Sequence, residues 1–268
     1  TVNADVVRFL GTQCAALTPC FKQRHVINDE DFHAVFELGR WTVNWCWKDS
    51  EPDMTDSVAS YPMNPEVRQK FETEVNQWIQ EGILSKKESH VGGIIPLFAV
   101  VQLNKGKVRP VLNFKNVNAS VRSHTADAQE CRASLRSWRM MGDNIAVVDL
   151  KRAYLQIHVS SELWKYQTVK FKNEYYNLTR LGFGLKSAPK IMDKIVSYVL
   201  KQSDIINKGT AHYVDDIIIN LNVVSEQDVV RHLRLYGLKI RDGPSFKFDA
   251  ESEFRVCVLF QTECRCRV

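Results

Sequence analysis

Apolar residues recur along the chain at spacings that predict helices and strands in mixed order. Between 61 and 84 they fall three or four residues apart, which is typical of an amphipathic helix with one buried face. Asn64 precedes this stretch as a candidate N-cap, Pro65 suits the first turn, and Gly82 follows the end. We therefore predict a helix between Asn64 and Gly82.

Two other stretches have the pattern of strands. In 94–114 two apolar runs flank Asn-Lys-Gly at 104–106, a tight-turn sequence, which indicates a β-hairpin. From 40 to 48 apolar and polar residues alternate, as they do in a half-buried strand. The rest of the first 60 residues and the last 28 residues show no clear periodicity.

The C-terminal half alternates between strands and helices. The apolar start of 144–159 predicts a central strand, and 178–200 predicts a glycine-containing loop followed by a helix that Ser187 caps. The stretch 209–220 predicts a hairpin, and 225–240 predicts a helix that ends near Gly237. This order of elements favours an α+β fold.

Two adjacent carboxylates, Asp215 and Asp216, interrupt the apolar hairpin, and Asp149 lies at the end of the earlier strand. Like charges repel, and burying a carboxylate without a partner is unfavourable. One interpretation is ordinary turn chemistry, because aspartate is common in turns and at strand ends. The other is that the three strand ends meet and share a cation.

Carboxylates without nitrogen or sulfur ligands suit Mg²⁺, which prefers carboxylates, water and substrate phosphates. Two Mg²⁺ ions about 4 Å apart are the usual arrangement for in-line displacement at phosphorus. The three aspartates are therefore candidates for phosphoryl transfer chemistry.

Composition adds few constraints. The 268 residues are 44% apolar and 25% charged, as in ordinary globular proteins of one large or two modest domains. A net charge of +5 is compatible with a polyanionic partner. Seven scattered cysteines predict neither a disulfide framework nor a zinc knuckle. No apolar run approaches the roughly 18 residues of a membrane span, so we expect no membrane partner.

Five segments, in order, resemble those of reverse transcriptases, especially from LTR retrotransposons and retroviruses. YVDD at 213–216 resembles the Y-x-D-D motif, and VVDLKRAYLQIHV at 147–159 resembles the first carboxylate motif. LGFGLKSAPKIM at 181–192 resembles the L-P-F-G segment, KGKVRPVLNFKNVN at 105–118 a fingers segment, and 61–84 the helix before it.

The resemblance implies a role for each matching residue. Asp149, Asp215 and Asp216 would be the catalytic carboxylates that bind two Mg²⁺ ions. Tyr154 would be a steric gate whose ring leaves no room for a 2′-OH, although a core aromatic is the alternative. The remaining nucleotide-binding candidates are Arg109, Lys105, Lys107, Phe183 and Gly184; for the two lysines, solvated turn residues are the alternative.

The chain departs from the family pattern at several positions. Gly182 replaces the proline of L-P-F-G, which we expect to loosen the loop. Asn113 and Lys115 replace an Asp and an Arg, which removes a predicted ion pair. Lys239 and Lys247 are both candidates for the lysine that protonates pyrophosphate, and the sequence does not choose between them.

The fold implied is α+β: the fingers and palm of a right-hand polymerase, with an antiparallel palm sheet backed by helices and the thumb missing. We expect fingers from 61–122 and 157–180, and palm from 123–156 and 181–250. An N-terminal extension of unclear fold, 1–60, and an irregular tail, 251–268, complete the chain.

The implied function is that of an RNA-directed DNA polymerase, which adds deoxynucleotides to a primer 3′-OH. Its partners would be an RNA or DNA template with primer, deoxynucleoside triphosphates, and the RNase H and integrase of a parent Pol polyprotein. We expect a cytoplasmic location, with virus-like particles as an alternative. The first rival is a catalytically decayed retroelement remnant that only binds nucleic acid. A second, an RNA-dependent RNA polymerase, conflicts with the bulk of Tyr154.

Overall fold

The chain divides into two compact units, which are described separately. The first unit comprises 1–124 and 153–191, and the second comprises 125–152 and 192–268. These two units are compact parts of the chain. The limits predicted above for the fingers and the palm stay predictions. The computed structural model describes residues 24–54, 61–88, 93–102, 106–122, 136, 138–241 and 246–248.

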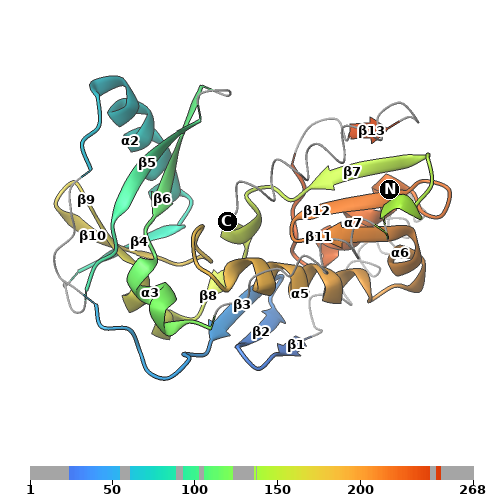
Figure 1. Cartoon of the computed structure of the whole chain (residues 1–268), viewed down its shortest axis with the longest axis horizontal. Helices are drawn as coiled ribbons and strands as arrows, with labels where there is room; N and C mark the ends of the chain where they lie inside the picture. Colours follow the sequence, from blue (N-terminus) through green and yellow to red (C-terminus); the bar gives the residue numbers. More distant parts are fainter. Residues whose placement is uncertain are drawn as a thin grey trace, which may run out of the picture. The chain divides into compact units, whose positions relative to one another are not determined.

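The first unit contains an N-terminal sheet of strands β1 (His25–Asn28), β2 (Phe32–Glu37) and β3 (Arg40–Trp45), paired antiparallel. Strand β8 (His158–Val159) joins β3 in parallel, so this sheet has the order β1-β2-β3-β8 (Figure 1). The alternating pattern of β3 was predicted, and its three large apolar side chains are buried. The strands β1 and β2 were not predicted, although Phe32, Ala34 and Phe36 of β2 are buried at alternate positions.

The predicted amphipathic helix is α2 (Pro65–Gln80), and its start is capped as expected. The Val67 N–H donates to Asn64 Oδ1 at 2.8 Å, which satisfies one of the free amides of the first turn. Phe71, Val75 and Trp78 form the buried face of the helix. The hydrophobic period therefore predicted this element correctly.

The predicted hairpin is also present, as β5 (Leu97–Gln102) and β6 (Lys107–Leu112). A third sheet has the order β4-β10-β9. The remaining elements of the first unit are β4 (Leu84–Lys87), α3 (Lys115–Ser120), η3 (Ala153–Gln156), η4 (Ser161–Gln167), β9 (Thr168–Phe171) and β10 (Glu174–Leu178).

The second unit is built on an antiparallel sheet with the order β11-β12-β7-β13. Ile217, Ile218 and Ile219 of β12 are fully buried, as a strand inside the sheet requires. Figure 1 shows β7, β12 and β11 side by side in this order. The strands are β7 (Ile145–Asp149), β11 (Thr210–Tyr213), β12 (Asp216–Asn220) and β13 (Phe246–Phe248).

Three helices accompany this sheet: α5 (Ala188–Leu200), whose first turn belongs to the first unit, α6 (Asp204–Gly209) and α7 (Glu226–Leu235). Ser187 does not cap α5 as predicted: its hydroxyl is buried and has no hydrogen-bond partner among the described residues. The α7 helix is capped by Ser225, whose Oγ accepts the Asp228 N–H at 3.1 Å.

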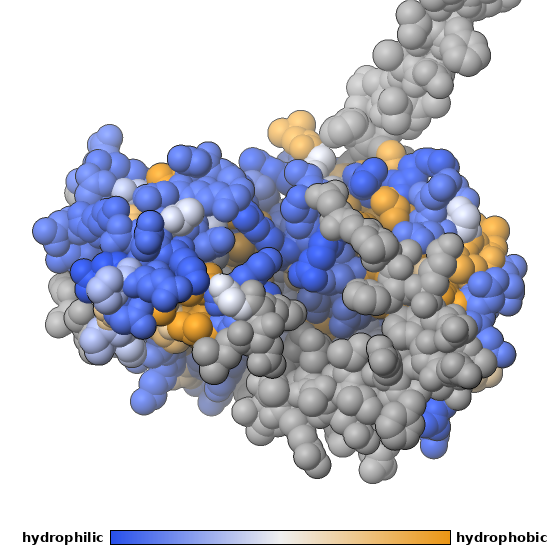
Figure 2. Space-filling model, turned by 90° about the horizontal axis from the view of Figure 1, so that it is seen from above, coloured by the Kyte–Doolittle hydropathy of each residue, from blue (hydrophilic) through white to orange (hydrophobic). Residues whose placement is uncertain are grey.

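One face of the described surface is mostly hydrophilic. In Figure 2 hydrophilic residues make up most of the described surface on the face shown, with only small apolar patches. Among the described residues, no helix has the length and apolar character to cross a membrane.

Candidate active site

The pairing of β12 with β7 brings two of the predicted catalytic residues together. Asp216, the first residue of β12, lies directly opposite Asp149, the last residue of β7. Side chains at opposite positions of an antiparallel pair share one face, with Cβ atoms about 5 Å apart. Two carboxylates in this arrangement repel each other, so the position demands a positive charge nearby.

Asp215 lies in the turn that joins β11 to β12. The Leu150 N–H donates to the Asp215 carbonyl oxygen at 3.3 Å, so the turn is attached to the residue after Asp149. All three aspartates are partly buried. The structure thus gathers the three predicted carboxylates at one end of one sheet, although Asp215 is 66 positions after Asp149 in the sequence.

A positive charge does lie beside Asp149, and sequence reasoning missed it. Arg241 Nη1 is 2.9 Å from Asp149 Oδ2. The segment that carries this arginine runs along the end of β7, since Ile240 bridges to Leu150 and the Lys151 N–H donates to the Lys239 carbonyl at 2.9 Å. No local pattern marks Arg241 in the sequence, because only the fold brings this segment to the carboxylates.

The three aspartates suit Mg²⁺ as ligands, because their donor atoms are carboxylate oxygens. Two of these aspartates, Asp149 and Asp216, also lie opposite each other in neighbouring strands. In the described part of the chain, however, no three His, Cys, Asp or Glu side chains converge closely enough to hold a metal ion. One oxygen of Asp149 is engaged by Arg241 instead. Arg241 would therefore compete with a metal ion for this oxygen of Asp149.

The turn before the aspartates carries backbone strain at Val214. Its φ is +57°, in the left-handed region, where a β-branched side chain is rare. Such a conformation costs about 1–3 kcal/mol and persists only when the surroundings hold it. The Val214 side chain is buried, which contributes to holding the turn.

Asp193 of α5 contacts this strained residue. Its Oδ1 accepts the Val214 N–H at 3.4 Å and is 3.2 Å from His212 Nε2 on β11. Burial by itself raises the pKa of the Asp193 carboxyl, but the hydrogen bond and charge of His212, with the Val214 N–H, outweigh it and lower the pKa. The carboxylate form, which accepts the Val214 N–H and faces His212 Nε2, is therefore favoured.

Two predicted nucleotide-binding residues, Tyr154 and Phe183, are neighbours in the first unit. Their ring centroids are 5.1 Å apart and the planes meet at 66°, an edge-to-face contact. Gly184 follows with φ +99°, and a Cβ there would lie 3.2 Å from the Leu112 carbonyl oxygen. Glycine is thus required at this position by backbone conformation.

Asn118 holds the glycine loop and was not given a role from the sequence. Its Nδ2 donates to the Gly184 carbonyl and its Oδ1 accepts the Lys186 N–H, both at 2.8 Å. One amide side chain therefore clamps both sides of Leu185. The only signal for it was its place as the last residue of the fingers segment.

The basic candidates lie on β6. Lys107 and Arg109 are two residues apart, both are exposed, and they share the outer face of the strand. Lys105 lies outside the described residues. Lys247 lies on β13, of which only the backbone is described, so the choice between Lys239 and Lys247 stays open.

Comparison with known proteins identifies the family. The profile described as "Reverse transcriptase (RNA-dependent DNA polymerase)" matches residues 86–242. An uncharacterized Caenorhabditis elegans protein, K02A2.6, is 28% identical over 234 residues, which is 80% of this chain and 17% of that protein. A retrovirus-related Pol polyprotein from the Drosophila melanogaster transposon opus is 28% identical over 168 residues, which is 60% of this chain and 16% of the polyprotein.

Solved structures agree on the fold. The native protease-reverse transcriptase of prototype foamy virus superposes with a TM-score of 0.58 at 18% identity, covering 89% of this chain and 30% of that one. A foamy viral protease-reverse transcriptase solved with double-stranded DNA superposes with a TM-score of 0.55 at 17% identity. The match covers 92% of this chain and 42% of that one. This chain spans 17% and 16% of the first two curated relatives. The polymerase fold, the motif order and the family match together show that the chain belongs to the reverse transcriptase family.

Proposed function

We propose that this chain catalyses template-directed addition of deoxynucleotides to a primer 3′-OH, with two Mg²⁺ ions held by Asp149, Asp215 and Asp216. The observation that carries the proposal is the register of β12 and β7, which sets Asp216 opposite Asp149 beside the Asp215 turn in a chain of this family. Three carboxylates gathered without a metal would repel one another.

Mg²⁺ would supply charge neutralisation at the triphosphate and activation of the primer hydroxyl. The chain's own residues provide the oxygen ligands and hold them at the end of a rigid sheet. A metal ion bound at Asp149 Oδ2 would displace Arg241 from that oxygen. Arg241, 61% exposed, is free to move into solvent.

The nucleotide would contact residues of the first unit. The Tyr154 ring, packed edge-to-face against Phe183, would exclude a 2′-OH and so select deoxynucleotides. Arg109 and Lys107, on the outer face of β6, would bind the triphosphate, for which the guanidinium fork of arginine is well suited. Gly184 would let the backbone approach the base pair closely.

The partners proposed are an RNA or DNA template with primer, and deoxynucleoside triphosphates. A relative in simian foamy virus is named a Pro-Pol polyprotein, which supports a parent polyprotein for this chain. RNase H and integrase are the further domains that we propose for that parent. The foamy viral neighbour with double-stranded DNA supports duplex binding. A cytoplasmic location, or one in virus-like particles, is the corresponding proposal.

A second function is favoured by one observation. Arg241 already neutralises the charge of Asp149 through an ion pair. Such a pair is expected in a decayed remnant that binds nucleic acid but no longer binds metal. Under this alternative the metal site would be lost and the binding surface retained.

Primer extension separates the two functions. On poly(rA)/oligo(dT) with dTTP and Mg²⁺, we expect the wild type to extend the primer and Asp216→Asn to lose more than about 100-fold in rate. That size follows because even outer-shell partners of metal ligands contribute 10–100-fold. Asp143→Asn, which changes an exposed loop carboxylate, is the matched control and should extend like the wild type.

A variant of Arg241 helps to decide between the polymerase and the binding remnant. A folded wild type that binds the template–primer but does not extend it would contradict the polymerase proposal. If Arg241→Gln then gains extension, the ion pair with Asp149 is the block; if it does not, the chain is a binding remnant.

A further inference from the structure

The feature that leads beyond the proposed mechanism is the contact between α5 and the back of the aspartate turn. Asp193 is 22 residues before Asp215 in the sequence, on a helix, and has no place among the carboxylates that would bind metal. Its Oδ1 nevertheless accepts the N–H of Val214, the residue directly before Asp215, at 3.4 Å. A group outside the catalytic set thus touches the backbone that carries it.

Val214 is the residue of the turn that most needs such a contact. It is β-branched, and its φ of +57° lies where L-residues with branched side chains are rarely found. If the N–H lost its acceptor, the residue would be free to relax toward a negative φ. Because Asp215 follows it in the chain, that relaxation would move the carboxylates with it.

The Asp193 carboxylate has a second neighbour, on β11. His212 on β11 approaches the same carboxylate oxygen through Nε2 at 3.2 Å, and its side chain is 19% exposed. His212 lies opposite Ile217 in the register of β11 and β12, so it belongs to the rigid part of the hairpin. The carboxylate therefore connects the strand before the turn with the turn itself.

From this geometry we infer that Asp193 is a positioning residue of the polymerase site. Its carboxylate holds Val214 in the left-handed conformation and thereby sets the placement of Asp215 and Asp216. The inference rests on the proposed function, since it concerns the same carboxylates. It assigns Asp193 no contact with metal or substrate.

The first experiment measures the contact without any activity. The exchange rate of the Val214 amide, measured by NMR, should rise about tenfold or more in Asp193→Ala, because the N–H loses its acceptor. Asp193→Asn keeps an oxygen that can accept this bond and should retain most of the protection. Asp143→Ala, the exposed control, should match the wild type. Unchanged protection in Asp193→Ala would overturn the inference.

The second experiment tests whether the contact works through backbone strain. Glycine adopts positive φ without steric penalty, so the turn should need Asp193 much less in the V214G background. We expect Asp193→Ala to weaken Mn²⁺ binding and to lower kcat about tenfold, the lower end of the effect of outer-shell partners, with KM for the template–primer unchanged. The same substitution should have little effect when made in V214G.

The outcomes distinguish this inference from the proposed function. A wild type that binds no Mn²⁺ overturns the metal site and, with it, the role of Asp193. A wild type that binds Mn²⁺ while Asp193→Ala binds it equally well overturns only the inference. If Asp193→Ala lowers Mn²⁺ binding and kcat equally in the wild-type and V214G backgrounds, Asp193 stabilises the fold without holding the strained turn.

Discussion

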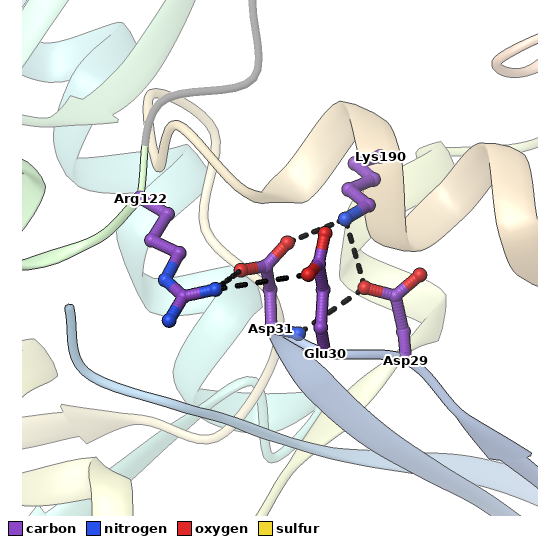
Figure 3. Close-up of polar contacts among 5 residues, drawn as sticks. All are labelled: Asp29, Glu30, Asp31, Arg122 and Lys190. Carbon is purple, nitrogen blue, oxygen red and sulfur yellow. Dashed lines mark hydrogen bonds and ion pairs between the residues drawn. The ribbon is translucent and has the colours of Figure 1, made fainter.

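At the residue scale, the Lys190 ammonium of the first unit pairs with two carboxylates. It lies 2.8 Å from Asp29 Oδ1 and also pairs with Asp31, while Arg122 Nη1 is 3.4 Å from Asp31 Oδ1 (Figure 3). Only 5% of the Asp31 side chain is exposed. Burial by itself lowers the pKa of Lys190, but its bonds to Asp29 and Asp31 raise it. The cluster attaches the β1–β2 turn to the first turn of α5.

Removal of the Lys190 charge should therefore destabilise the chain. Breaking a buried pair by deleting one partner costs 3–5 kcal/mol, and we expect about 2 kcal/mol for Lys190→Met because Arg122 still faces Asp31. Urea unfolding measures the change. Lys194→Met, at an exposed position of the same helix, is the control and should stay within about 0.5 kcal/mol of the wild type. Equal values for the two variants would contradict the role of the cluster.

At the element scale, the loop before α5 shows how a departure from the family pattern is accommodated. A Cβ on Gly182 would lie 2.3 Å from Phe114 Cζ and 2.5 Å from its Cε2. Phe114 is 2% exposed, so its ring fills the space that a side chain at 182 would need. The glycine was expected to loosen the loop; instead it leaves room for a packed aromatic ring.

Gly182→Ala is accordingly expected to lower the free energy of unfolding by about 1–3 kcal/mol, the usual effect of overpacking a filled core. Phe114→Leu should restore part of this loss, because the smaller side chain frees the space around position 182. Thermal or urea unfolding of the two single variants and the double variant gives the coupling. Additive effects would show that the ring and the loop do not compete for this space.

The elements also show what hydrophobic period can predict. The α2 helix, the β5–β6 hairpin, the β11–β12 hairpin and α7 were predicted because each has a clear period and a marked turn or cap. The strands β9 and β10 were missed, since each is short and gains its stability from neighbours in the sheet. Ser187 has the right residue type for a cap, yet packing buries its hydroxyl.

At the scale of the whole molecule, His158 is a group whose protonation opposes folding in acid. His158 lies beside Thr42 of β3 and bridges to Arg180, and Arg40 is two residues before Thr42 on the same face. Burial, followed by the positive charges of Arg180 and Arg40, lowers the pKa of His158 to about 4. The imidazole is therefore neutral in the folded chain at pH 7.

This pKa gives a direction to the pH dependence of stability. The folded pKa of about 4 lies below the ordinary 6.5, so the unfolded chain binds more protons between these values. We expect the free energy of unfolding to fall as the pH is lowered from 6.5 toward 4. Between pH 6.5 and 5, the free energy of unfolding of His158→Gln, measured in urea, should fall less than that of the wild type. His33→Gln, at an exposed position on β2, is the control; equal slopes for both variants would refute the assignment.

The sequence by itself determined the family, the elements with a clear hydrophobic period and the identity of the candidate catalytic residues, because motif spacing and hydrophobic period are local properties of the chain. Only the tertiary structure decided which distant groups meet these residues. Arg241 reaches Asp149, Asp193 supports Val214, and Asn118 clamps the Gly184 loop. Such contacts join segments far apart in the sequence, and they arise from strand register and packing that no local pattern encodes.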